Sequence, residues 1–161
     1  MRKQLILFII FIFSSFYSFG QNFQIPDYKR AEDFKTYEKD VLKAIDFLLE
    51  KPVDHPDRKE ANAYVLAWAE GSPSVKVSLN GYVTPLFDRN PDLLMVYIGA
   101  WIKHELSDEE LTTTTINIKA TESLVKYYAN DANHLKKDPD VKKLVKKLEK
   151  GNLADWVKSQ L

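Results

Sequence analysis

The chain has 161 residues, with 23 basic and 23 acidic side chains, three histidines and no cysteine. The lack of cysteine excludes disulfide stapling, thiol catalysis and thiolate-bound metal, so stability has to come from a packed core. The even charge balance argues against a nucleic-acid-binding protein, which needs a dominant basic surface.

The first twenty residues have the features of a secretory signal peptide. Two basic residues precede an unbroken apolar run over 5–13, and small residues lead to Gly20. This run is too short to span a bilayer, which takes about 20 residues, so we expect cleavage after Gly20. The sequence therefore predicts a signal peptide at 1–20, one domain at 21–161, and a periplasmic or secreted location.

Two amphipathic helices are predicted in the first part of this domain. Apolar residues recur at spacings of three and four over 27–51, with charged residues between them, and Pro52 ends the pattern. A second helix follows the loop at 54–57 and runs to Glu70, where Gly71 supplies the expected C-terminal chemistry.

Residues 74–87, SVKVSLNGYVTPLF, allow two interpretations. Alternating apolar residues before Asn80-Gly81 predict a β-hairpin, whereas the apolar residues of 79–87 recur at helical spacing. A lone two-stranded hairpin is marginally stable in water, and both flanks are predicted to be helical. We favour a short extended or irregular piece at 74–77, followed by an irregular helix to about Arg89.

Three further helical regions follow. Asn90-Pro91 starts a helix over 92–106 whose uncharged core predicts a central, fully buried element, with Gly99 allowing a neighbouring helix to approach closely. Ser107 and the acidic residues after it predict the start of a long helix to about Asn130, although the threonine-rich beginning alone would suit a strand.

The C-terminal region contributes two more helices. An apolar stripe at 141–148 ends at Gly151, and Asn152 caps a short last helix. The fold class expected is therefore all-α, a single compact bundle of about six helices with the irregular piece near 74–77.

No catalytic or metal-binding motif is present. His55, His104 and His134 lack metal-ligand spacing, and the chain has no GxSxG elbow and no glycine-rich phosphate loop. We assign no catalytic residue, no metal ligand and no cofactor. Enzymatic activity stays open only as a hydrolase with an unrecognised site, around Glu70, Asp88 and His104.

The candidate binding residues are two tyrosines and two pairs of lysines. Tyr127 and Tyr128 are adjacent on a predicted helix, so they cannot face the same way and one should be exposed. Residues 135–161 hold eight lysines against four acidic residues. This basic region could bind an anionic surface; the alternative interpretation is an ordinary helix face exposed to solvent. The lysines named as partner-binding candidates are Lys142, Lys143, Lys146 and Lys147.

The tryptophans Trp68, Trp101 and Trp156 lie on apolar helix faces, where aromatic side chains usually belong to the core. A groove of Trp and Tyr side chains for a peptide or glycan is the alternative interpretation.

The stretches Leu66-Ala67-Trp68, Gly71-Ser72-Pro73 and Asn90-Pro91-Asp92-Leu93-Leu94, with Val75, Val77 and Trp101, resemble small, signal-bearing, all-helical exported proteins of Gram-negative bacteria. The resemblance implies an exported helical domain and supplies no catalytic residue.

The sequence thus predicts an exported, non-enzymatic helical domain that binds an envelope protein or peptide and no nucleic acid. One alternative is association with an anionic lipid surface of the envelope through the lysine-rich C-terminal helix. The other is the hydrolase.

Overall fold

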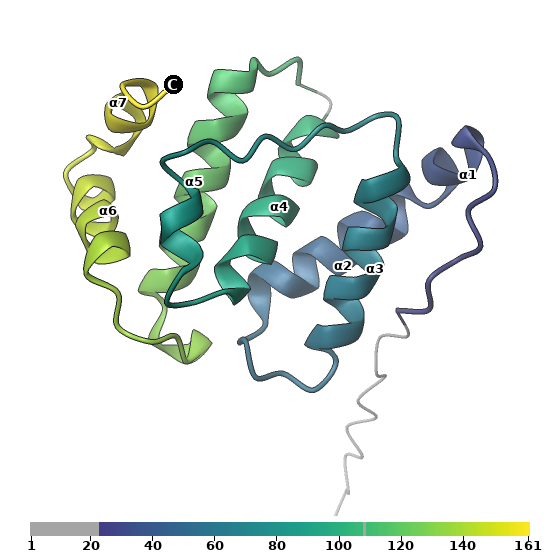
Figure 1. Cartoon of the computed structure of the whole chain (residues 1–161), viewed down its shortest axis with the longest axis horizontal. Coiled ribbons are helices and arrows are strands. Elements are labelled where there is room, and N and C mark those ends of the chain that lie inside the picture. The colour runs from purple at the N-terminus through teal and green to yellow at the C-terminus, as the bar shows by residue number, and fades with distance from the viewer. Residues whose placement is uncertain (1–22, 108) are drawn as a thin grey trace, which may run out of the picture.

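The computed structural model describes residues 23–107 and 109–161, so the predicted signal peptide lies outside the described residues. This part of the chain forms seven α-helices and two 3₁₀ helices, without a strand, and confirms the predicted all-α bundle (Figure 1). The elements are α1 (Ala31–Thr36), α2 (Glu38–Glu50), α3 (Arg58–Gly71), η1 (Thr84–Phe87), α4 (Asp92–Glu105), α5 (Thr113–Ala129), η2 (Asp131–Asn133), α6 (Pro139–Glu149) and α7 (Leu153–Lys158).

Helix α4 is the centre of the bundle. It packs most extensively against α5 and next against α2, while α3 covers α2, and α6 and α7 cover α5 (Figure 1). Eight residues of α4, from Leu93 to Ile102, are buried, as its uncharged sequence predicts. A Cβ atom added to Gly99 would lie 3.3 Å from Cγ2 of Ile45, so this glycine does allow α2 to approach closely. In the described part of the chain, no helix combines the length and apolar character needed to cross a bilayer.

The single helix predicted over 27–51 is instead two helices, α1 and α2, that meet at Tyr37. The Phe34 carbonyl accepts a 2.9 Å hydrogen bond from the Trp68 indole, which ties α1 to α3. A Cβ atom on Gly71 would overlap the Phe34 ring. Gly71 does not have positive φ, so the prediction that it ends the helix as a left-handed capping glycine was wrong. The position needs glycine for another reason, because the Phe34 ring occupies the space that a side chain would fill.

Residues 74–87 contain the predicted irregular piece but not a hairpin. The chain crosses the molecule without helix or strand from Ser72 to Asn80, turns at 81–83, and then forms η1 (Figure 1). A type I′ hairpin turn requires positive φ at both central residues, and neither Asn80 nor Gly81 has it. The favoured helix to about Arg89 is reduced to the single turn of η1.

The buried side chain of Asn117 on α5 holds this segment in place. Its Oδ1 accepts hydrogen bonds from Asn80 Nδ2 at 2.7 Å, the Tyr82 hydroxyl at 3.2 Å and the Tyr97 hydroxyl at 3.1 Å. Its amide nitrogen donates to the Thr113 carbonyl of the same helix at 2.9 Å. These bonds satisfy the Asn117 amide in the core, which offsets the cost of burying it.

Helix boundaries near α5 and α6 follow local capping. The predicted helix start at Ser107 was wrong, because the Ser107 hydroxyl donates to the His104 carbonyl at the end of α4, and Thr112 caps α5 by accepting from the Thr115 N–H. After α6, Gly151 has φ +71°, and its N–H donates to the Leu148 carbonyl. The glycine that ends α6 is therefore in the left-handed conformation that the sequence predicted.

Candidate functional site

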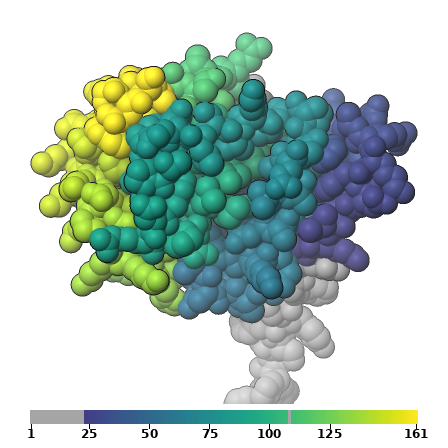
Figure 2. All heavy atoms as spheres, in the orientation of Figure 1, coloured from purple at the N-terminus to yellow at the C-terminus, as the bar shows by residue number. Residues whose placement is uncertain are grey.

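An apolar groove lies between η1, α6 and α7, and we call it the Trp156 groove. Its volume is ≈ 220 Å³. In Figure 2 the teal atoms of residues near 80–87 meet the yellow and yellow-green atoms of α6 and α7 on one face of the molecule. The lining residues are Tyr82, Pro85, Leu86, Asp140, Lys143, Leu144, Lys147 and Trp156.

Two aromatic side chains at right angles line this groove. The Tyr82 and Trp156 rings meet edge to face, with centroids 5.5 Å apart. The Tyr82 hydroxyl is bonded to Asn117 and, at 3.1 Å, to Thr121, so the ring is fixed before any ligand arrives. Trp156 is half-buried, whereas Trp68 and Trp101 lie in the core as predicted, with exposed fractions of 0% and 1%. Trp156 is therefore the tryptophan that a partner can reach.

Two of the four predicted lysines form the rim of the Trp156 groove. Lys143 pairs with Asp140 at 2.8 Å, which raises the pKa of Lys143 and lowers the pKa of Asp140. Lys147 lines the groove without an ion pair to any described residue. Lys142 and Lys146 are exposed on α6 outside the lining of the groove. The structure thus brings Lys143 and Lys147, but not Lys142 and Lys146, into the groove that Tyr82 and Trp156 line.

The two predicted tyrosines use their hydroxyl groups within the fold. Tyr127 is 4% exposed, and its hydroxyl donates to the Lys51 carbonyl at 2.7 Å. Tyr128 is half-buried; its hydroxyl donates to the Asp138 carbonyl at 3.2 Å and accepts from the Asp138 N–H at 2.6 Å. Neither tyrosine lines the Trp156 groove. Their hydroxyl groups join α5 to the segments that precede α3 and α6.

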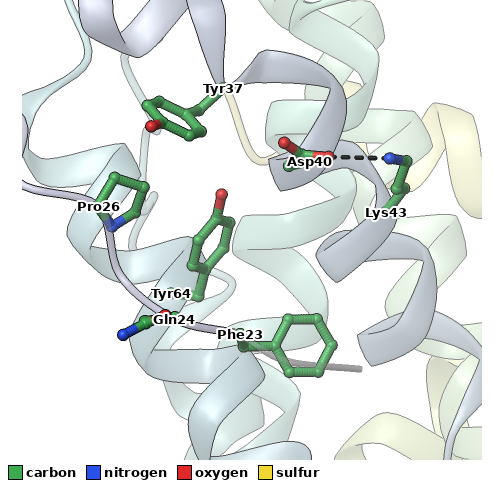
Figure 3. Close-up of a pocket in the computed structure, with 7 residues that line it drawn as sticks. All are labelled: Phe23, Gln24, Pro26, Tyr37, Asp40, Lys43 and Tyr64. Atoms are coloured by element: carbon green, nitrogen blue, oxygen red, sulfur yellow. Dashed lines mark hydrogen bonds and ion pairs between the residues drawn. The ribbon is translucent and has the colours of Figure 1, made fainter. Parts of the chain in front are cut away.

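A second pocket of ≈ 370 Å³, which we call the Tyr64 pocket, lies where the N-terminal segment crosses α2 and α3 (Figure 3). It combines aromatic walls with an ion pair between Asp40 and Lys43 at 2.9 Å. Burial, and less strongly the nearby Asp40 carboxylate, raise the pKa of Tyr64, so its hydroxyl stays protonated at neutral pH. The lining residues are Phe23, Gln24, Pro26, Tyr37, Asp40, Lys43 and Tyr64.

The three residues of the hydrolase hypothesis do not share a pocket. His104 lies in an acidic pocket with Glu105 and Glu109, and this pocket contains neither Glu70 nor Asp88. Burial, together with the positive charges of two nearby lysines, lowers the pKa of His104. Among the described residues, no group of three histidine and carboxylate side chains is placed to hold a metal ion.

The sequence analysis missed the aromatic part of both pockets. Tyr82 and Trp156 come from segments 74 residues apart in the chain, so no local pattern joins them. The sequence of α7 gives no signal for Trp156 either, because the apolar residues Leu153 and Val157 accompany it in the same short helix. Tyr37 and Tyr64 lie within the two amphipathic segments predicted to be helical, and both pack against the core and also line the Tyr64 pocket.

Comparison with known proteins gives no matching family model, no matching curated protein and no matching solved structure. The resemblance to small exported helical proteins therefore stays a prediction, and the function has to be argued from the geometry of the pockets.

Proposed function

We propose that this chain is an exported, non-enzymatic helical domain that binds a protein or peptide partner in the cell envelope through the Trp156 groove. The observation that carries the proposal is a half-buried tryptophan, held edge to face by a fixed tyrosine, at a groove with a lysine rim. Exposed aromatic anchors beside charged rims are typical of protein interfaces, where Trp and Tyr supply much of the binding energy.

The size of the Trp156 groove favours a peptide side chain over a small-molecule ligand. Its ≈ 220 Å³ is below the roughly 300–1,000 Å³ of small-molecule sites. A groove of this size accommodates one large side chain of a partner, with the rest of the partner lying on the surrounding surface. Lys147, and Lys143 with its Asp140 partner, then favour carboxylates next to that anchor.

The test is binding of residues 21–161 to an array of short peptides, each with one central aromatic residue in an acidic or a neutral sequence. We expect a subset of peptides with an aromatic anchor to bind, and Pro85→Glu to weaken this binding at least tenfold. Pro85 is exposed, so the new charge enters the groove without disturbing the core. Lys126→Gln, on the outer face of α5, is the control and should leave binding unchanged.

Unchanged peptide binding in Pro85→Glu, with the fold confirmed by circular dichroism, would contradict the proposal. So would the absence of binding to every peptide in the array at millimolar concentration.

Association with an anionic envelope surface is the second candidate, because Lys142 and Lys146 are exposed on α6. Sedimentation with vesicles of anionic phospholipid separates the two functions. The variant to compare carries both Lys142→Gln and Lys146→Gln. If the protein associates with the lipid surface, this double variant should bind vesicles less. If it binds peptides through the Trp156 groove, the same variant should keep its affinity for the peptides.

A further inference from the structure

The Tyr64 pocket is separate from the Trp156 groove and shares no lining residue with it. The helices α2 and α3, which supply three of its seven lining residues, lie on the opposite side of α4 from α6 and α7 (Figure 1). The wall supplied by the N-terminal segment is fixed by packing, because Phe23 meets Phe47 edge to face with centroids 5.1 Å apart. Tyr37 is held in the same way by Tyr28, at 5.7 Å. The pocket is therefore largely preformed.

Aromatic and polar groups alternate around this pocket. In Figure 3 the hydroxyl end of Tyr64 points toward the space between Tyr37 and Asp40, and Pro26 and Lys43 lie on opposite sides of the Tyr64 ring. The aromatic rings and the proline offer flat apolar surface. The two phenol groups, the Gln24 amide and the Asp40–Lys43 pair offer hydrogen-bond donors and acceptors within reach of the same ligand.

The charges of the pocket cancel. Asp40 and Lys43 are 2.9 Å apart, and the other five lining residues are uncharged. A charged ligand of either sign would be attracted by one of these groups and repelled by the other at similar range, so the pocket favours neither sign. A purely apolar ligand would cover these polar groups without satisfying them, which costs free energy. The ligand that fits best is neutral and carries both an apolar face and several hydroxyl groups.

We propose that the Tyr64 pocket binds one or two rings of a neutral pyranose saccharide. A pyranose ring presents a face of C–H groups that packs on aromatic side chains, and hydroxyl groups at its edge that both donate and accept hydrogen bonds. The volume of ≈ 370 Å³ lies within the roughly 300–1,000 Å³ range of small-ligand sites. This site is independent of the proposed peptide groove, so either proposal stands if the other fails.

Saturation-transfer NMR on residues 21–161 tests the proposal with five probes. The neutral probes are methyl glucoside, cellobiose and diacetylchitobiose, and the charged ones are glucosamine and glucuronate. We expect at least one neutral probe to bind in the millimolar range, more tightly than either charged probe. Gln24→Ala should weaken that binding several-fold, and Tyr37→Ala at least tenfold. Glu122→Gln, on α5, is the control that keeps an ordinary fold and ordinary binding.

The Asp40→Asn variant should change which probe is preferred, and a purely structural role of Asp40 would not cause such a change. Asp40 is exposed, so the variant should fold, and it leaves Lys43 without its partner. We expect this variant to gain affinity for glucuronate relative to the neutral probes. The proposal is overturned if no neutral probe binds, if glucosamine binds most tightly, or if Gln24→Ala, Tyr37→Ala and Asp40→Asn all leave the preference among the five probes unchanged.

Discussion

Arg58 is the residue whose environment departs most from what its type would suggest. It is the first residue of α3, yet it is only 2% exposed. Its Nη1 donates to the carbonyls of Leu48 and Lys51, each at 2.9 Å, and its guanidinium lies 5.3 Å from the centre of the Tyr127 ring. A positive charge here satisfies carbonyl groups at the C-terminal end of α2. Burial lowers the pKa of Arg58, but arginine stays protonated at neutral pH.

At the residue scale we expect Arg58→Ala to reduce the free energy of unfolding by about 3 kcal/mol, because the buried Leu48 carbonyl and the partly buried Lys51 carbonyl lose their charged donor and a cavity forms. Arg58→Lys should lose less, since it keeps the charge without the planar fork. Urea unfolding measures both variants, with exposed Lys59→Gln as the control. The Nε and Nη2 atoms of Arg58 lack hydrogen-bond partners among the described residues, so burying the guanidinium also costs free energy. If Arg58→Ala loses no more stability than the control, this cost cancels the free energy that the Nη1 hydrogen bonds contribute.

At the scale of single elements, the segment before η1 shows how a loop without regular structure is positioned. Residues 72–80 belong to no helix or strand, so regular backbone hydrogen bonds do not position them. Side-chain hydrogen bonds from Asn80 and Tyr82 to Asn117 attach the end of this segment to α5. The bond from the Tyr82 hydroxyl also helps to fix the Tyr82 ring that lines the Trp156 groove. The Asn117 side chain therefore contributes both to the stability of the loop and to the shape of the groove.

We expect Asn117→Ala to destabilise the fold by about 3 kcal/mol, because three donors lose their shared acceptor in a buried site. Amide hydrogen exchange over 75–83 should speed up, and affinity for peptides that bind the Trp156 groove should fall. Tyr82→Phe removes one of the three donors and should have a smaller effect, of about 1 kcal/mol. Glu122→Gln on the same helix is the control. Unchanged exchange over 75–83 in Asn117→Ala would show that other contacts hold the loop.

At the scale of the whole molecule, the two pockets lie on groups of helices that meet at the centre. Helices α2 and α3 pack on one side of α4, and α6 and α7 pack on α5, which packs on the other side of α4. The buried residues form one continuous cluster that runs from Val41 in α2 to Val157 in α7. With one core and no separate units in the described chain, the two groups of helices depend on each other.

We expect residues 21–161 to unfold in one cooperative transition in urea. Trp68 and Trp101 report on the core and Trp156 on the C-terminal helices, so tryptophan fluorescence samples both regions. Fluorescence and far-ultraviolet circular dichroism should give the same midpoint and the same dependence on urea. Two midpoints, with the fluorescence change coming first, would show that α6 and α7 separate from α5 before the core unfolds.

Local patterns were sufficient to predict most helices. The buried helix α4, the glycine after α6 and the space that Gly99 leaves for a neighbouring helix were each predicted from a short stretch of sequence, and each was confirmed. The errors came where a distant residue intervened. The Trp68 indole binds the Phe34 carbonyl close to the point where α1 ends, and the Asn117 side chain binds Asn80 at the predicted hairpin turn.

The sequence by itself determined the all-α class, the central helix and the basic character of the C-terminal region, because helical periodicity, capping and charge are properties of neighbouring residues. It also named Lys142, Lys143, Lys146 and Lys147 as binding candidates without a distinction among them. Only the tertiary structure decided that Lys143 and Lys147 share a groove with Tyr82 and Trp156, and that Phe23 and Tyr64 line a second pocket. Pockets form where segments distant in the chain meet, and packing of the whole core decides which segments those are.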